Sequence, residues 1–199
     1  SPPRFRPRHA SRRLSPSICH MYLVFRTADV DDVDDIVTLV TAAYRGDSSR
    51  EGWTTEADLL EGQRVDSEGV VADIQKPGSL ILLGESEGET VACVHLEQEA
   101  DAGYFGMFAV HPRMQGSGLG KAVMAEAERI VRDDWSLPAM RMTVIDVRDS
   151  LLAFYERRGF VRTGETEPFP YGDPRFGIPQ RDDLRFAVLV KRLDGRSGS

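Results

Sequence analysis

Residues 110–121 read Val-His-Pro-Arg-Met-Gln-Gly-Ser-Gly-Leu-Gly-Lys, and this spacing is typical of a turn that binds anions. The apolar run 104–110 precedes the turn and apolar residues at helical spacing follow it, which predicts a strand, a glycine-rich turn and a helix in series. Gly116, Gly118 and Gly120 lack Cβ atoms and can adopt positive φ, so successive backbone N–H groups can converge at the start of the helix. The predicted chemistry is the binding of phosphate groups.

The spacing of these glycines disfavours two common nucleotide sites. The phosphate-binding loop of NTPases would need glycine at Gln115 and a hydroxyl residue at Ala122. A dinucleotide fingerprint beginning at Gly116 would need glycine at Lys121. A nucleotide-binding switch is therefore disfavoured.

The remaining pattern, Gln-x-x-Gly-x-Gly at 115–120 after a strand ending in Ala-Val-x-Pro, resembles the acetyl-coenzyme A loop of the GNAT acetyltransferase superfamily. A second segment, 151–160, reads Leu-Leu-Ala-Phe-Tyr-Glu-Arg-Arg-Gly-Phe and resembles the late helix of that family, followed by the Gly-Phe that opens its next strand. Taken alone, the apolar residues of this second segment fit ordinary core packing equally well. Together the two segments predict a member of this superfamily, with the subfamily unassigned.

The resemblance implies that acetyl-CoA is the cosubstrate and that no metal takes part. It also implies that the strand ending at Val110 diverges from its neighbour, that pantetheine lies in the gap, and that the loop binds the pyrophosphate. The family often carries Asn seven residues before the tyrosine of the late helix, where this chain has Arg148, which could reach a phosphate instead. The implied cofactor-binding residues are Phe108, Ala109, Val110, Gln115, Gly116, Ser117, Gly118, Leu119, Gly120, Lys121 and Arg148.

The reaction implied by the resemblance is direct attack of an amine on the thioester, without a covalent acyl-enzyme. Tyr155, with an ordinary pKa near ~10, is the predicted proton donor to the departing thiolate, whose pKa is close to ~8.5. A lysine-like amine has a pKa near ~10.4 and needs a base, yet segment 103–108 lacks the glutamate that many family members place there. Glu97 is the predicted substitute, with His95 on the same face of the strand, although a polar strand edge explains both residues as well.

The acceptor is predicted to be an amine of a small molecule or a peptide. In this architecture the first two helices and the loop before the last strand form the acceptor pocket, and here they supply Tyr44, Trp53, Arg64 and Tyr171. A packing role explains Trp53 as well as a place in the pocket does, and an exposed position on a helix explains Arg64 as well. An alternative function is an acyl-CoA-binding module with little or no turnover, but a pure binder needs no acid such as Tyr155. A homodimer is frequent in the family, and nothing in the sequence marks an interface.

Length and composition predict one folded domain. The chain has 199 residues, 41% of them hydrophobic, and no apolar stretch approaches the ~20 residues that span a bilayer. Cys19 and Cys93 have no spacing typical of a disulfide framework or a zinc site, and Cys93 fits a buried strand position. We therefore expect a soluble, cytoplasmic protein without a membrane partner.

Charge is unevenly distributed along the chain. Residues 1–20 hold five arginines and no acid, so the remaining residues carry 20 basic and 32 acidic side chains, a net charge of −12. An acidic body argues against nucleic-acid binding and favours cationic acceptors. Prolines in the first segment disfavour a targeting helix, and a natural start at Met21 is expected, with a disordered extension before it. The predicted domain is 21–193, and 194–199 is predicted to fray.

The predicted fold is α/β: a GNAT-like mixed, mostly antiparallel sheet of about six to seven strands with helices on both faces. Acids at 31, 32, 34 and 35 are expected to be solvated and to interact with a helix start rather than to bind a metal. The predicted strands are 22–26, 80–85, 90–97, 104–110, 140–147, one from 160, and 184–191. The predicted helices run from a cap at Asp29 to Tyr44, over 56–65, up to Gln75, after the glycine loop, and around Tyr155.

Overall fold

The computed structural model describes residues 23–45, 58–61, 64–173 and 176–195. The predictions that concern residues 1–20, Met21, Cys19 and Trp53 lie outside the described residues. No helix in the described part is long and apolar enough to cross a membrane.

A mixed seven-stranded sheet forms the centre of the molecule, as predicted, with the order β1-β3-β4-β5-β6-β9-β7. All neighbours in it pair antiparallel except β5 and β6, which are parallel. A separate two-stranded sheet joins β2 to β8. The strands are β1 Val24–Thr27, β2 Leu60–Glu61, β3 Ser79–Ser86, β4 Glu89–Gln98, β5 Gly103–Val110, β6 Ala139–Ile145, β7 Val161–Pro168, β8 Ile178–Pro179 and β9 Arg185–Arg192.

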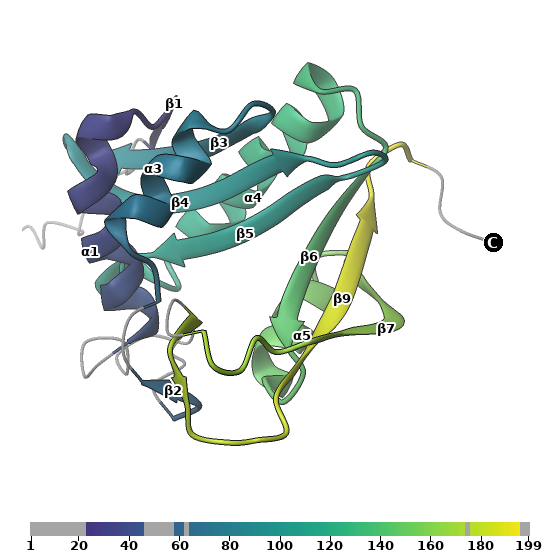
Figure 1. Cartoon of the computed structure of the whole chain (residues 1–199). Coiled ribbons are helices and arrows are strands. Elements are labelled where there is room, and N and C mark those ends of the chain that lie inside the picture. Colours follow the sequence, from purple (N-terminus) through teal and green to yellow (C-terminus); the bar gives the residue numbers. More distant parts are fainter. Residues whose placement is uncertain (1–22, 46–57, 62–63, 174–175, 196–199) are drawn as a thin grey trace, which may run out of the picture.

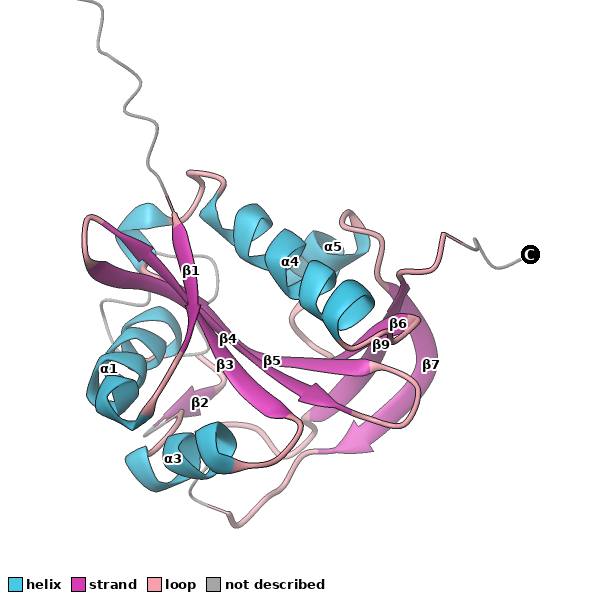
Figure 2. Cartoon of the chain, turned by 90° about the horizontal axis from the view of Figure 1, so that it is seen from above, coloured by secondary structure: helices cyan, strands magenta, loops and turns pink. Residues whose placement is uncertain are grey.

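Helices cover both faces of the sheet, α1 and α3 on one face and α4 and α5 on the other (Figure 2). Alternation along the strands divides the core accordingly. Cys93 and Ala109 belong to the apolar cluster of α1 and α3, whereas Val94 and Phe108 belong to that of α4 and α5. The helical segments are η1 Val30–Asp32, α1 Val33–Tyr44, α3 Ser67–Gln75, η2 Pro112–Met114, α4 Leu119–Arg129, the π-helical η3 Ile130–Asp134 and α5 Asp149–Glu156.

The sheet opens between β5 and β6. These strands pair only at Gly103 with Met140 and at Tyr104 with Arg141. Beyond these pairs they diverge, and Figure 1 shows β5 and β6 running apart from a shared end. The second half of β5 therefore presents one backbone edge to a gap rather than to a strand, which is the divergence that the resemblance implied.

The predicted helix over 56–65 is wrong where the structure describes that segment. Residues 58 and 59 form a turn, and Leu60 and Glu61 form β2. β2 pairs with β8, and Leu60 is buried against Phe169 and Leu184. The partners lie more than 100 positions away along the sequence, so local helix propensity is overridden by a contact that periodicity does not report.

Asp32 is also not the solvated acid that was expected. Its carboxylate is buried, accepts two hydrogen bonds from the Arg26 guanidinium, at 2.7 and 2.6 Å, and accepts one from the Asp29 amide at 2.8 Å. The hydrogen bonds from Arg26 are the main cause that holds the pKa of Asp32 below its ordinary value. This cluster fastens the start of α1 to β1.

We expect Asp32→Asn to lower the free energy of unfolding at pH 7 by about 1–3 kcal/mol, because it leaves part of the Arg26 guanidinium without its charged partner. The folded pKa of Asp32 lies below the unfolded one, so its contribution is full above the unfolded pKa and is lost as the pH falls through the folded pKa. The difference between the two proteins should therefore shrink at strongly acid pH. Urea unfolding at pH 7 and pH 3 measures this difference in the free energy of unfolding. The matched control is Asp31→Asn at an exposed position, and an equal loss of stability in the two variants at pH 7 would contradict the prediction.

Candidate active site

The glycine loop between β5 and α4 forms one wall of a cavity of about 420 Å³, which we call the loop cavity. Gly116 and Gly118 adopt positive φ, 83° and 91°, and both line the cavity. Gly120 does not adopt positive φ; it lies in the first turn of α4 and also lines the cavity. Because the first amides of a helix have no partner inside the helix, the start of α4 offers N–H donors to an anion here.

Three cationic side chains add to the positive potential of the loop cavity. Lys121 comes from α4, and Arg157 and Arg158 follow the end of α5. The Arg158 guanidinium lies 3.3 Å from the centre of the Phe154 ring and donates to the Phe154 carbonyl at 2.9 Å, while its Nε is buried without a hydrogen-bond partner among the described residues. Burial is the main cause that lowers the pKa of Arg158. A buried donor without a partner beside such a turn fits a phosphate oxygen.

The other predicted loop residues shape the cavity in different ways. The Gln115 side chain donates to the Val110 carbonyl at 3.0 Å and so ties the loop to the end of β5. The Ser117 hydroxyl donates to the Met114 carbonyl within the loop. Leu119 is buried in the core and anchors α4. The loop is thus held by its own contacts, with its glycines and Lys121 left to face the cavity.

A second cavity, of about 440 Å³, lies beside the gap between β5 and β6, and we call it the central cavity. It adjoins the loop cavity along two elements. On β5, Phe108 lines the central cavity and Val110 the loop cavity; on α5, Tyr155 lines the central cavity and Phe154 the loop cavity. A molecule that binds at the loop can therefore extend through the opened sheet.

Backbone amides of β5 face the gap. The amide of His111 donates to Val91 of β4 at 2.9 Å, so alternation along the strand turns the Val110 and Phe108 amides toward the opposite edge. The same alternation turns the Ala109 amide toward β4, so the structure does not bring this predicted cofactor contact to the gap. Of the three predicted cofactor-binding residues of β5, only Phe108 and Val110 have amides that face the gap.

A β-bulge sets the position of these amides. Cys93 pairs with Ala109 and His95 with Gly106, so β5 has one more residue than β4 between the two pairs. Met107 lies in this extra stretch and adopts a positive φ of 47°. Bulges bend the strand and re-aim its groups, and they are frequent beside active sites. Here Phe108 is itself the second residue of the bulged stretch.

Tyr155 is buried at 4% exposure, and its side chain lines the central cavity. Its ring packs edge-on against the rings of Phe105, Phe154 and Phe160. Burial is the main cause that raises the pKa of Tyr155 well above 10, and nearby Tyr44 raises it further, whereas Arg148 acts in the opposite direction. The phenol therefore keeps its proton at neutral pH.

Of the two predicted bases, the structure brings only His95 to the central cavity, together with Asp73 of α3. Glu97 does not line it, and its carboxylate forms an ion pair with Lys76 at the end of α3. Both side chains face α3, as the alternation predicts. What separates them is position along β4: Glu97 lies near the end of the strand and beyond the cavity.

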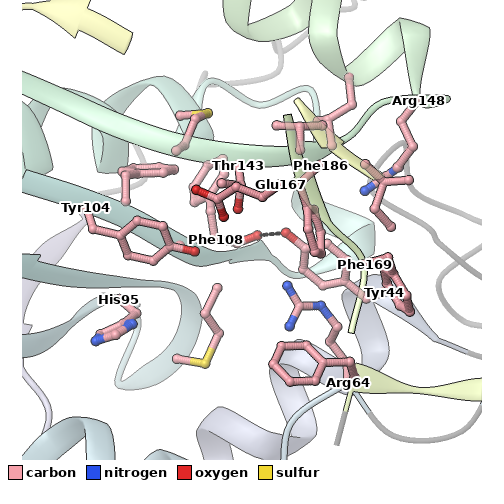
Figure 3. Close-up of a pocket in the computed structure, with 18 of the residues that line it drawn as sticks. Tyr44, Arg64, His95, Tyr104, Phe108, Thr143, Arg148, Glu167, Phe169 and Phe186 are labelled. Carbon is pink, nitrogen blue, oxygen red and sulfur yellow. Dashed lines mark hydrogen bonds between the residues drawn. The ribbon is translucent and has the colours of Figure 1, made fainter. Parts of the chain in front are cut away.

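The predicted acceptor residues divide in the same way. Tyr44 and Arg64 line the central cavity; the Tyr44 hydroxyl donates to the Phe108 carbonyl, and the Arg64 guanidinium lies 5.1 Å from the Tyr44 ring centre (Figure 3). Arg148 lines this cavity and not the loop cavity. Tyr171 lines neither: its hydroxyl accepts from the Leu184 amide at 2.7 Å, and so it supports the loop whose residues 168–170 do line the central cavity.

Other reactive groups are accounted for. Cys93 is fully buried, and burial raises the pKa of its thiol to about 12, which makes it inert at neutral pH. Within the described ranges, no group of three or more His, Cys, Asp or Glu side chains is arranged to hold a metal ion.

The sheet opened between parallel strands leaves room for an extended arm between an anion-binding turn and a buried phenol, an arrangement that suits an acyl thioester of coenzyme A. The model of the acetyltransferase (GNAT) family matches residues 34–160, and the chain belongs to this family. It is an acetyltransferase, and enzymes of this family transfer the acetyl group of acetyl-CoA to amine acceptors.

Solved structures of N-acetyltransferases share the fold. The ribosomal-protein-S18-alanine N-acetyltransferase of Escherichia coli is 13% identical, with a TM-score of 0.63 over 88% of this chain and 97% of the other. An N-acetyltransferase of Staphylococcus aureus Mu50 is 12% identical, with a TM-score of 0.65 over 86% and 98%. The PaiA N-acetyltransferase of Thermoplasma acidophilum, in complex with coenzyme A, is 16% identical, with a TM-score of 0.59 over 86% and 99%. A search of curated protein sequences finds no match to this chain.

Proposed function

We propose that the protein transfers an acetyl group from acetyl-CoA to a primary amine of a small molecule or peptide by direct attack on the thioester. The observation that carries this proposal is the adjacency of the two cavities across the opened sheet. One cavity has the donors and cations that suit a pyrophosphate, and the other has three phenols, a histidine and the carboxylates of Asp73 and Glu167, which suit an amine reaction.

The loop cavity is the proposed site of the coenzyme A phosphates. The amides at the start of α4 hold the pyrophosphate, with Lys121, Arg157 and Arg158 around it. The acyl arm passes between β5 and β6. There it accepts hydrogen bonds from the amides of Phe108 and Val110, in the place of a strand that would otherwise pair with this edge of β5. The buried Arg158 Nε, which has no hydrogen-bond partner in the described part of the chain, supports this fit.

The same amides are the proposed stabilisers of the reaction. Attack of the amine forms a C–N bond and puts negative charge on the thioester oxygen, which a fixed N–H donor stabilises by about 3–4 kcal/mol in comparable acyl-transfer sites. Collapse of this tetrahedral species breaks the C–S bond. Tyr155 then donates its proton to the sulfur, since its raised pKa keeps it protonated at neutral pH.

The central cavity is the proposed acceptor site, with Tyr44 and Arg64 among its walls. Two structural neighbours carry names that identify amine acceptors, the alanine of a ribosomal protein and spermidine. An amine is therefore the acceptor class that the relatives support, and the acidic body of the chain favours its approach.

The test is a titration calorimetry and activity experiment on the intact chain. We expect saturable binding of acetyl-CoA and none of ATP or NAD. With acetyl-CoA present, a panel of polyamines, amino acids and peptides with free N-termini should release coenzyme A thiol for at least one acceptor, with the acetylated amine seen by mass spectrometry. Absence of acetyl-CoA binding would overturn the proposal, and binding without turnover of any amine would favour a pure acyl-CoA-binding module.

A further inference from the structure

A polar cluster around the buried His95 lies at the side of the central cavity that α3 covers. His95 is 7% exposed, and its Nε2 lies 2.8 Å from the Ser79 Oγ. The Ser79 hydroxyl donates its proton to the Asp73 carbonyl at 2.7 Å. In the view of Figure 3, His95 and Tyr104 lie on the opposite side of the cavity from Arg148.

These contacts define which nitrogen of His95 is protonated. A serine hydroxyl has one proton, and that of Ser79 is committed to the Asp73 carbonyl, so toward Nε2 its oxygen can only accept. Nε2 therefore carries the hydrogen. Burial lowers the pKa of His95, which favours the neutral ring, and in a neutral ring Nδ1 then has the free lone pair.

The Nδ1 atom lies near a carboxylate at the wall of the cavity, a combination that suits an ammonium group. Nδ1 lies 3.9 Å from the Asp73 Oδ2, too far for a direct hydrogen bond, and both residues line the central cavity. Besides Asp73, the charged groups that act on the imidazole are Lys76, the C-terminal cap of α3, and Glu97 of β4, and these two pair with each other. The Tyr104 ring of β5 packs edge-on against the imidazole, with ring centres 6.2 Å apart.

We propose that His95 is the base that accepts the proton of the acceptor ammonium at Nδ1, that Asp73 attracts this ammonium, and that Ser79 is a positioning residue that holds the tautomer. This inference rests on the proposed acetyl transfer. The ammonium loses one proton to Nδ1, which makes an imidazolium, and the neutral amine attacks the thioester. The nitrogen loses a second proton to solvent as the amide forms, while the sulfur takes a proton from Tyr155, which solvent restores; the imidazolium then releases its proton to solvent.

The position of His95 along the sheet agrees with this role. It pairs across the strands with Gly106, and Phe108 follows two residues later along β5. The two β5 residues between Gly106 and Ala109 form the bulge, so the imidazole lies across the strand pair from the segment that carries the Phe108 amide, where the thioester is proposed to bind. Glu97, two residues further from the gap along β4, lacks this access.

The experiment compares His95→Gln with Glu97→Gln, using the best acceptor found for the wild-type enzyme. We expect His95→Gln to lower kcat/KM by about 10²–10³-fold and to leave the Kd for acetyl-CoA within a few-fold, because a general base contributes about 10²–10⁴-fold. The wild-type profile of kcat/KM should fall on its acid side below the ordinary histidine pKa of 6.5, and this limb should be absent in His95→Gln. Ser79→Ala should lower kcat and shift the same limb.

The possible results of these experiments separate the assignment of the base from the proposed acetyl transfer. A larger loss in Glu97→Gln than in His95→Gln, or an acid limb that persists without His95, overturns the assignment of the base while the wild-type turnover keeps the acetyl transfer intact. A wild-type enzyme that turns over no amine overturns both. Imidazole ¹⁵N NMR of the wild-type protein needs no variant to fold: a hydrogen on Nε2 supports the assignment, and a neutral ring with its hydrogen on Nδ1 overturns it.

Discussion

Gly118→Glu is expected to raise the Kd for acetyl-CoA at least about 100-fold, which corresponds to about 2.7 kcal/mol. Gly118 is the N-terminal cap of α4, lines the loop cavity, and has open space where a Cβ would lie. A glutamate side chain therefore extends into the cavity, where it occupies the space of a phosphate and adds a like charge. Titration calorimetry with acetyl-CoA measures the effect.

The backbone strain of this substitution needs a matched control. Gly118 has a φ of 91°, and a residue with a Cβ in the left-handed region costs about 1–2 kcal/mol. Gly88, in the turn between β3 and β4, has a φ of 83° and equally open space, and it lines neither cavity. Gly88→Glu should lose similar stability and retain acetyl-CoA affinity. If both variants, or neither, lost affinity, the loop would not be the coenzyme A site.

Tyr155→Phe is expected to lower kcat about 10²–10³-fold, since general acid catalysis contributes about 10²–10⁴-fold. The change removes only the hydroxyl, so the ring contacts with Phe105, Phe154 and Phe160 remain, and the Kd for acetyl-CoA should change by no more than a few-fold. Single-turnover release of the thiol, with enzyme in excess over bound acetyl-CoA and with saturating acceptor, measures the chemical step.

The pH dependence gives Tyr155 a second test. Its pKa is raised well above 10 by burial, so the phenol stays protonated and should cause no loss of kcat on the basic side up to pH 10. An acetyl thioester whose thiol has a low pKa needs less help from a proton donor. Its turnover should therefore fall less in Tyr155→Phe than the turnover of acetyl-CoA does. Unchanged turnover of acetyl-CoA by Tyr155→Phe would show that the proton reaches the sulfur from another donor.

The two groups that sequence analysis missed, Arg157 with Arg158 and Asp73 with Ser79, share one physical property. Arg157, Arg158 and Asp73 lie in a helix or directly after one, and Ser79 opens β3, so local pattern gives none of them a role; each gains its role from an element distant in the sequence. Arg158 meets the glycine loop at the loop cavity, and Asp73 meets His95 across α3 and β4. The adjacent arginines before Gly159 were a visible signal, because two cations after a helix near a predicted phosphate site have few structural uses.

Local backbone chemistry explains why much of the architecture was readable from the sequence. Apolar runs bounded by turn residues located β3, β4, β5, β6 and β9 to within a few residues, and the spacing of Gly116, Gly118 and Gly120 predicted the turn before α4. These features depend on neighbours a few positions apart, which the sequence lists in order. The family followed from the same local patterns, and the match over 34–160 confirmed it.

Only the tertiary structure decided which predicted side chains meet. Alternation placed His95 and Glu97 on one face, but the packing of α3 gave Glu97 a partner in Lys76 and left His95 beside the cavity. The pairing of β2 with β8 replaced a predicted helix, and Arg148 came to the central cavity instead of the phosphates. These outcomes depend on contacts between distant segments, whose free energies outweigh local propensity and which no periodicity records.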